Sequence, residues 1–231
     1  MSSGYHLTFD IDWAPDWSVR DTLDILAQAG AHATFFVTHD SPTIGEISSA
    51  GHEIGIHPNF QTSSTQGKDP LEIVGNLLEL VPEARAMRTH GLIQGSLLLR
   101  DVITAYPQIC YDMSVLTYRF PHSGWFNWKL GGACVQRINY VWEDADHDWS
   151  EYVPISTVDV LDFHPIHVSL NSRTGNRYQM AKNTLGRRSL LSLERNEVES
   201  LRGTAPGTAD YLRSALAKAG TALSFEELLC V

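Results

Sequence analysis

The first half of the chain alternates between short apolar runs and amphipathic stretches, and this alternation constrains the fold more than any other feature. The expected strands span residues 5–12, 33–38, 52–57 and 85–90, and the expected helices between them span residues 19–29, 42–50 and 69–81. Pro70 after Asp69, and Gly30 after the first amphipathic stretch, are helix start and stop signals. Strand–helix–strand repetition of this kind is typical of parallel βαβ units. We therefore expect an α/β fold with a parallel sheet.

The second half is less regular. We expect a helix at 97–105, a strand at 109–116, long loops over 117–156 with one strand at 133–141, a strand at 158–164, mixed helix and loop over 173–205, and a helix at 208–219. The sequence contains no internal repeat, low-complexity tract or linker. Residues 1–231 are therefore expected to form a single domain.

Composition and charge exclude several classes of function. The 231 residues are 43% hydrophobic and carry a formal net charge of −10, which argues against a nucleic-acid or anionic-membrane partner. No dinucleotide fingerprint or P-loop follows the first expected strand. No apolar stretch approaches the roughly 18 residues of a membrane span, and the N-terminus lacks the pattern of a secretory signal. We therefore expect a cytoplasmic protein.

Polar side chains capable of chemistry stand at the ends of several expected strands. They are Asp10, Asp12, His57, Arg88, His90 and His164, with Asp112 on a further strand. The carboxyl ends of parallel strands meet at one edge, where active sites form. Carboxylates and imidazoles suit zinc, which as a catalytic ion takes about three protein ligands and activates water. Because strand side chains alternate, Asp10 and Asp12 are expected on one face, one as ligand and one as base.

Five short segments resemble motifs of the polysaccharide deacetylase (NodB-homology, carbohydrate esterase) family. They are residues 8–12 (TFDID), 33–37 (ATFFV), 51–57 (GHEIGIH), 88–91 (RTHG) and 160–164 (VLDFH). Each motif is weak alone, but together they occur in the family's order over roughly residues 5–170. The resemblance implies a distorted (β/α) barrel of about seven parallel strands.

The resemblance also implies an activity, the hydrolysis of an N-acetyl or O-acetyl group on a sugar. Carried over by position, Asp10 becomes the catalytic base, Arg88 the residue that orients it, and His164 the acid. Asp12 and His57 become ligands of one divalent metal ion, with zinc expected.

Two departures from the family pattern affect the metal site. Ile11 separates two aspartates that are adjacent in the family, so either aspartate could be the base. Gln61 stands where the family has its second metal-binding histidine. His90 is our candidate for the missing ligand, because Asn59 and Gln61 offer only amide oxygens, which bind zinc weakly. The pattern resembles a divergent branch linked to surface-polysaccharide biosynthesis, which implies a nucleotide- or lipid-linked sugar as substrate.

Further residues are weighed against ordinary structural roles. Trp13 is a candidate for stacking on a sugar ring, and His167 for contacting substrate. The other tryptophans are expected to serve mainly in packing, and His52 is expected to be structural. Asp144 and Asp146, in an acidic run, are expected in a solvated loop rather than at the site.

The sequence thus predicts a metal-dependent sugar deacetylase. Two alternatives remain open. The same fold could serve an amidohydrolase acting on a cyclic amide or ureide, which would release no acetate from acetylated sugars. The absence of the usual second histidine could instead indicate a carbohydrate-binding protein without catalysis.

Overall fold

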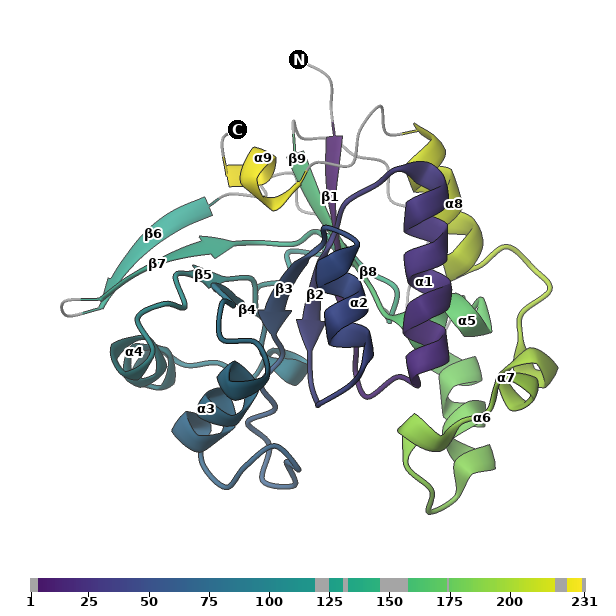
Figure 1. Ribbon diagram of the computed structural model, residues 1–231, viewed down its shortest axis with the longest axis horizontal. Helices are drawn as coiled ribbons and strands as arrows, with labels where there is room; N and C mark the ends of the chain where they lie inside the picture. The colour runs from purple at the N-terminus through teal and green to yellow at the C-terminus, as the bar shows by residue number, and fades with distance from the viewer. Residues whose placement is uncertain are drawn as a thin grey trace.

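The computed structural model describes residues 4–118, 125–130, 133–145, 158–173, 175–218 and 224–229. Within these residues nine strands form one sheet, in the order β6-β7-β5-β4-β3-β2-β1-β9-β8. All neighbouring strands are parallel except β6 and β7. The sheet curves into a half-barrel with helices along its outer side (Figure 1), which confirms the expected α/β barrel.

The bounds of the elements are as follows. The strands are β1 (Gly4–Asp10), β2 (Thr34–Val37), β3 (Glu53–Ile56), β4 (Ala86–Met87), β5 (Tyr111–Asp112), β6 (Trp125–Leu130), β7 (Ala133–Ile138), β8 (Trp142–Glu143) and β9 (Val158–Phe163). The helices are α1 (Asp16–Ala29), α2 (Thr43–Ser49), α3 (Pro70–Leu80), α4 (Ser96–Ala105), α5 (Pro165–Leu170), α6 (Gly175–Leu185), α7 (Arg195–Leu201), α8 (Thr208–Lys218) and α9 (Phe225–Leu229), with 3-10 turns η1 (His90–Leu92) and η2 (Leu190–Ser192).

The first half follows the expected pattern closely, and the middle of the chain does not. The strand expected at 133–141 is present as β7, but the prediction of loops around it is wrong where β6 pairs with β7 and β8 pairs with β9. Residues 119–124, 131–132 and 146–157 lie outside the described part of the chain. The strands expected at 5–12, 85–90 and 109–116 are shorter than predicted. Each shortened strand leaves its last polar residues in a loop at the edge of the sheet.

The two faces of the sheet differ in chemistry because strand side chains alternate. On β1, Leu7 and Phe9 are fully buried in the main apolar core, where the sheet packs against the helices. Thr8 and Asp10 point to the other face, into the barrel. The barrel interior thus receives the polar side chains of a strand that is otherwise apolar.

Local signals in the sequence explain where the helices begin and end. The Asp69 side chain accepts hydrogen bonds from the backbone N–H groups of Leu71 and Glu72 at the start of α3, as an N-cap does. Gly30 ends α1 with a positive φ of 61°, a conformation that glycine adopts without steric cost. These caps confirm the predicted starts and stops.

The two ends of the barrel interior are unlike. At the amino ends of the strands, α9 contributes Phe225 and Leu228 to a small apolar cluster with Phe36, Val160 and neighbouring residues, close to the start of β1 (Figure 1). At the carboxyl ends the interior is polar. No helix within the described part of the chain is both long enough and apolar enough to cross a membrane.

Candidate active site

A tight turn after β1 places Asp12. The backbone N–H of Ala14 donates to the carbonyl of Ile11 at 2.8 Å, and the two residues between them have positive φ angles, 47° for Asp12 and 56° for Trp13. Positive φ at both central positions is the pattern of a type I′ turn, which is strained for residues other than glycine. Asp12 therefore reaches the site from a turn, and not from the strand face that we expected it to share with Asp10.

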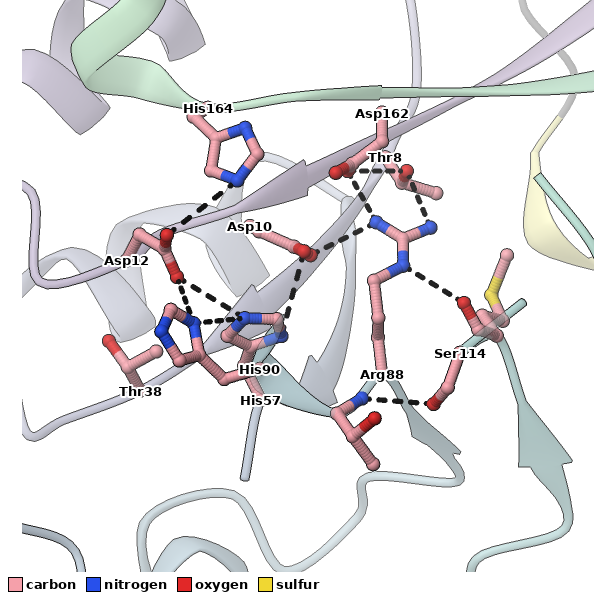
Figure 2. Close-up of polar contacts among 12 residues, drawn as sticks. Thr8, Asp10, Asp12, Thr38, His57, Arg88, His90, Ser114, Asp162 and His164 are labelled. Carbon is pink, nitrogen blue, oxygen red and sulfur yellow. Dashed lines mark hydrogen bonds and ion pairs between the residues drawn. The ribbon is translucent and has the colours of Figure 1, made fainter. Parts of the chain in front are cut away.

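Asp12, His57 and His90 bring one ligand atom each to a common point (Figure 2). Asp12 Oδ1 lies 2.9 Å from His90 Nδ1 and 3.2 Å from His57 Nε2, and the two nitrogens are 3.2 Å apart. A tetrahedral ion with bonds of about 2.0 to 2.1 Å keeps its ligand atoms about 3.3 Å apart. These three residues could therefore hold one divalent ion.

The surroundings of Asp12 keep its side chain ionised, as a metal-binding carboxylate must be. Burial alone would raise the pKa of Asp12, but hydrogen bonds to His57 and His90 outweigh it and hold that pKa well below its usual range. Burial likewise opposes the charged form of His90, yet the contact with Asp12 raises the pKa of the imidazole. The ionised carboxylate thus lies against two imidazoles, a combination that zinc commonly binds.

Arg88 forms the centre of a second, deeper cluster (Figure 2). Its Nη1 donates to Asp10 Oδ1 at 3.0 Å and to Asp162 Oδ1, its Nη2 donates to Thr8 Oγ1 at 2.9 Å, and its Nε donates to the Met113 carbonyl at 3.1 Å. The guanidinium is fully buried. Its position next to Asp10 is the one expected of a residue that orients a catalytic base.

Two carboxylates share this one guanidinium. Burial is the main cause that raises the pKa of Asp162 well above its usual range, with Arg88 opposing the shift and Asp10 adding to it. Asp162 Oδ2 is buried and has no hydrogen-bond partner among the described residues. Burial therefore opposes the charged form of Asp162, although Arg88 and Thr8 both donate to its Oδ1.

His164 ends β9 and faces Asp12 across the site. Its Nδ1 lies 2.7 Å from Asp144 Oδ1, its backbone N–H donates to Asp144 Oδ2, and its Nε2 lies 3.7 Å from Asp12 Oδ2. Burial opposes protonation, but the Asp144 carboxylate outweighs it and raises the pKa of His164 well above its usual value. His164 is thus held as an imidazolium, as a general acid requires.

The prediction that Asp144 lies in a solvated loop is wrong. Asp144 is buried, with 1% of its surface exposed, and it belongs to the site through His164. Asp146 lies outside the described residues. The signal that could have identified Asp144 is a β8–β9 pairing that brings it beside His164, which a linear pattern does not reveal.

A cavity at the carboxyl ends of the strands joins these groups. Its walls include Asp10, Asp12, His57, His90 and His164, and also Thr89, Gly91, Leu92, Tyr140, Glu143 and Ala145. The structure therefore brings together all the predicted catalytic and metal-binding residues, with Arg88 directly beneath Asp10.

The predicted substrate-binding residues pack against two histidines of this cavity. Trp13 packs edge-on against His90, with ring centroids 5.3 Å apart. His167 packs against His164 and bonds Ser172, and burial lowers the pKa of His167 to about 4, so that it is neutral. Neither is among the lining residues, and their contact with substrate stays a prediction.

Several other candidates lie away from the cavity walls. Asn59 and Gln61, the poorer ligand candidates, do not line it, and Asp112 pairs with Arg137. His52 packs against Phe35, consistent with a structural residue. Among the tryptophans, Trp142 is buried in the core and Trp17 donates to the Leu193 carbonyl, whereas Trp149 lies outside the described residues.

Besides Asp144, sequence reasoning missed other polar residues of the site, among them Thr8, Asp162, Tyr140 and Glu143. Thr8 and Asp162 stand two positions before Asp10 and His164, so strand alternation alone places them on the same inner face. Tyr140 and Glu143 carry no comparable signal. They follow a segment without periodicity, and only the pairing of β8 with β9 brings Glu143 to the cavity.

The half-barrel, with carboxylates and histidines gathered at its strand ends over a buried arginine, defines a barrel of the polysaccharide deacetylase type. A family model described as "WbmS-like: Polysaccharide deacetylase" matches residues 7–182. The chain belongs to this family. No match was found among curated proteins.

One solved structure agrees with the family assignment. A protein of Bordetella bronchiseptica, described as a polysaccharide deacetylase involved in O-antigen biosynthesis, is 30% identical over 93% of this chain and 90% of its own, with a TM-score of 0.77. A family 4 carbohydrate esterase from Streptomyces lividans is 14% identical over 94% of this chain and 90% of its own, with a TM-score of 0.47. The second likeness is too distant to support a functional argument.

Proposed function

We propose that this protein is a metal-dependent hydrolase that removes an acetyl group, N-linked or O-linked, from a sugar. The observation that carries the proposal is the convergence of three ligand atoms, a carboxylate and an imidazolium on one cavity. Membership in the polysaccharide deacetylase family supports a sugar as the substrate.

Each residue has a distinct role in this proposal. Asp12, His57 and His90 hold the ion, which when bound supplies Lewis-acid polarisation of the acetyl carbonyl and of a water molecule. Asp10, oriented by Arg88, accepts the proton of the attacking water. His164, held by Asp144, donates a proton to the departing amine or alcohol. Zinc is the ion that the two nitrogens and one carboxylate oxygen favour.

The Bordetella protein supports a more specific proposal for the substrate. Its description names O-antigen biosynthesis, and we propose that this chain likewise acts on a precursor of a surface polysaccharide. A nucleotide- or lipid-linked acetylated sugar in the cytoplasm would be such a precursor. Trp13 and His167, which support His90 and His164 from behind, stay candidates for substrate contact.

Metal content and acetate release test the proposal together. The purified protein should bind about one zinc ion, and Asp12→Ala and His57→Ala should abolish binding, whereas the control His52→Gln should retain it. Asp10→Asn and His164→Gln should keep the metal and lower the rate of acetate release by roughly 10²- to 10⁴-fold.

The outcomes separate the alternatives. Stoichiometric metal in both Asp12→Ala and His57→Ala would defeat the ligand assignment. Hydrolysis of a cyclic amide without acetate release from acetylated sugars would indicate an amidohydrolase. Sugar-dependent thermal stabilisation with no turnover at full metal loading would indicate a binding protein.

A further inference from the structure

Glu143 is a carboxylate in the active-site cavity for which the proposed reaction has no use. It belongs to β8, at the edge of the sheet, where it pairs with Asp162 of β9. Its side chain lines the same cavity as Asp10 and His164. A partly buried carboxylate loses part of its hydration, which is unfavourable unless hydrogen-bond donors replace the lost water. We therefore expect hydrogen-bond donors to contact Glu143.

One oxygen of Glu143 is held in place by the protein. The hydroxyl of Tyr140 donates to Glu143 Oε2 at 3.0 Å. Tyr140 itself is 1% exposed, and its ring lies against the Arg88 guanidinium, 4.4 Å from ring centroid to Cζ. The donor is therefore fixed, and Glu143 is pre-oriented before any ligand arrives.

The other oxygen is left for a ligand. Across the described part of the chain, Glu143 Oε1 has no hydrogen-bond or ion-pair partner, and it is not among the buried unpaired atoms. Burial raises the pKa of Glu143, an effect that the nearby His164 and the Tyr140 hydroxyl reduce. In either protonation state the side chain offers a hydrogen-bond acceptor to the cavity.

The charges around Glu143 restrict what that ligand group can be. The described cavity walls contain the carboxylates of Asp10, Asp12 and Glu143 and no lysine or arginine, and the His164 imidazolium in the same walls is paired with Asp144. A phosphate or carboxylate group next to Glu143 would meet like charge, which is unfavourable. A neutral group with an O–H donor meets no such cost, and sugar rings carry several.

We propose that Glu143, oriented by Tyr140, determines substrate specificity by accepting a hydrogen bond from a hydroxyl of the sugar ring that bears the acetyl group. This inference rests on the proposed function, and it adds that the reacting sugar is uncharged where it faces Glu143. Any phosphate of the substrate then lies farther along the molecule, outside this part of the cavity.

The test uses one probe with a sugar ring and one without. If the proposed function holds, the zinc-loaded protein should hydrolyse 4-nitrophenyl acetate, and N-acetylglucosamine should compete for the site. Glu143→Met removes the acceptor at similar size and should raise the inhibition constant of N-acetylglucosamine by about tenfold or more. Glu143→Gln, which keeps a neutral acceptor, should have a smaller effect, as should Tyr140→Phe. For Glu143→Met and Glu143→Gln, kcat/KM for 4-nitrophenyl acetate should fall by a smaller factor than the inhibition constant of N-acetylglucosamine rises.

Controls identify the contact. Glu53→Met, at the opposite end of the barrel, should leave both measurements unchanged. Monodeoxy analogues of N-acetylglucosamine identify the hydroxyl that Glu143 binds. The analogue without that hydroxyl should inhibit the wild type more weakly than N-acetylglucosamine does. Against Glu143→Met the two sugars should inhibit equally, because the variant has already lost the hydrogen bond.

Three results overturn the inference. The first is an inhibition constant that is the same in wild type and Glu143→Met, and the second is a wild type that N-acetylglucosamine does not inhibit. The third is a fall of kcat/KM for 4-nitrophenyl acetate in Glu143→Met by the same factor as the rise in inhibition constant, which would mean that Glu143 takes part in the chemistry. Failure of the proposed function looks different, because no metal-loaded form of the wild type would then release acetate from either probe.

Discussion

Two groups of potential metal ligands lie side by side at this site. They differ in whether an arginine side chain already contacts their carboxylates. Asp12, His57 and His90 form one group, and Asp10, Asp162 and His164 form the other. In each group the candidate ligand atoms lie within 4.8 Å of one another. Proximity of carboxylates and imidazoles is therefore not sufficient to identify a metal site.

The buried group is already neutralised by the protein. Arg88 donates to both Asp10 and Asp162, and Asp144 occupies the Nδ1 side of His164. In the open group, imidazoles contact the Asp12 carboxylate, and no lysine or arginine among the described residues does so. The comparison teaches that a fixed guanidinium can take the place of an ion, and that the group without one is the better candidate for metal.

Removing the buried cation should have the largest effect. Arg88→Met leaves Asp10 and Asp162 facing each other in the barrel interior without a counter-charge, and breaking a buried ion pair from one side costs about 3–5 kcal/mol. The free energy of unfolding, measured by urea titration, should fall by this amount. Arg20→Met, which breaks an exposed pair with Glu46, is the control and should change little. Equal stability of Arg88→Met and wild type would show that Arg88 is not the group's essential cation.

Metal should stabilise the protein through the open group alone. Free zinc at about 100 times its dissociation constant should add about 2.7 kcal/mol of stability, seen as a rise in melting temperature. His90→Gln should lose most of this rise, because Gln61 and Asn59 do not line the cavity and so cannot replace His90. Asp162→Asn should keep it in full. Loss of the zinc response in Asp162→Asn, with retention in His90→Gln, would reverse our assignment of the two groups.

The sequence revealed the open group more readily than the buried one. His57 and His90 end two expected strands, and parallel strands gather their carboxyl ends at one edge, so this convergence could be predicted. The predicted reason for Asp12 was wrong in detail, because the chain leaves β1 after Asp10 and turns back through two positive φ angles. Turn strain of this kind depends on tertiary support, such as the Trp13 N–H that donates to Thr38 Oγ1.

The unpredicted parts depend on long-range pairing. β6, β7 and β8 lie in a segment without clear periodicity, and strand formation there depends on cross-strand neighbours rather than on intrinsic preference. Glu143 and Asp144 come to the cavity only because β8 pairs with β9. Asp162 was predictable from its spacing to His164, yet its role depends on Arg88, a residue 74 positions away in the chain.

The smallest effect, and the sharpest test of the comparison, concerns the charge of Asp162. Burial raises its pKa on folding, so the folded state binds this proton more tightly than the unfolded state does. Wild-type stability must then fall as pH rises from the unfolded carboxyl pKa, near 4, towards the raised folded value. In Asp162→Asn the amide oxygen can still accept from Arg88 and Thr8, and nothing there titrates. The variant should lack this part of the decline and gain about 1 kcal/mol over wild type near neutral pH.

The matched comparison is Asp112→Asn, since Asp112 is equally buried and pairs with Arg137 through Nε at 2.7 Å. Losing that charge should lower stability, the opposite sign to Asp162→Asn. Unfolding free energies of both variants and wild type between pH 4 and 8 provide the check. A loss of stability in Asp162→Asn that grows with pH would mean that Asp162 is ionised and that Arg88 serves two charged carboxylates. The buried group would then carry net negative charge and would itself compete for a cation.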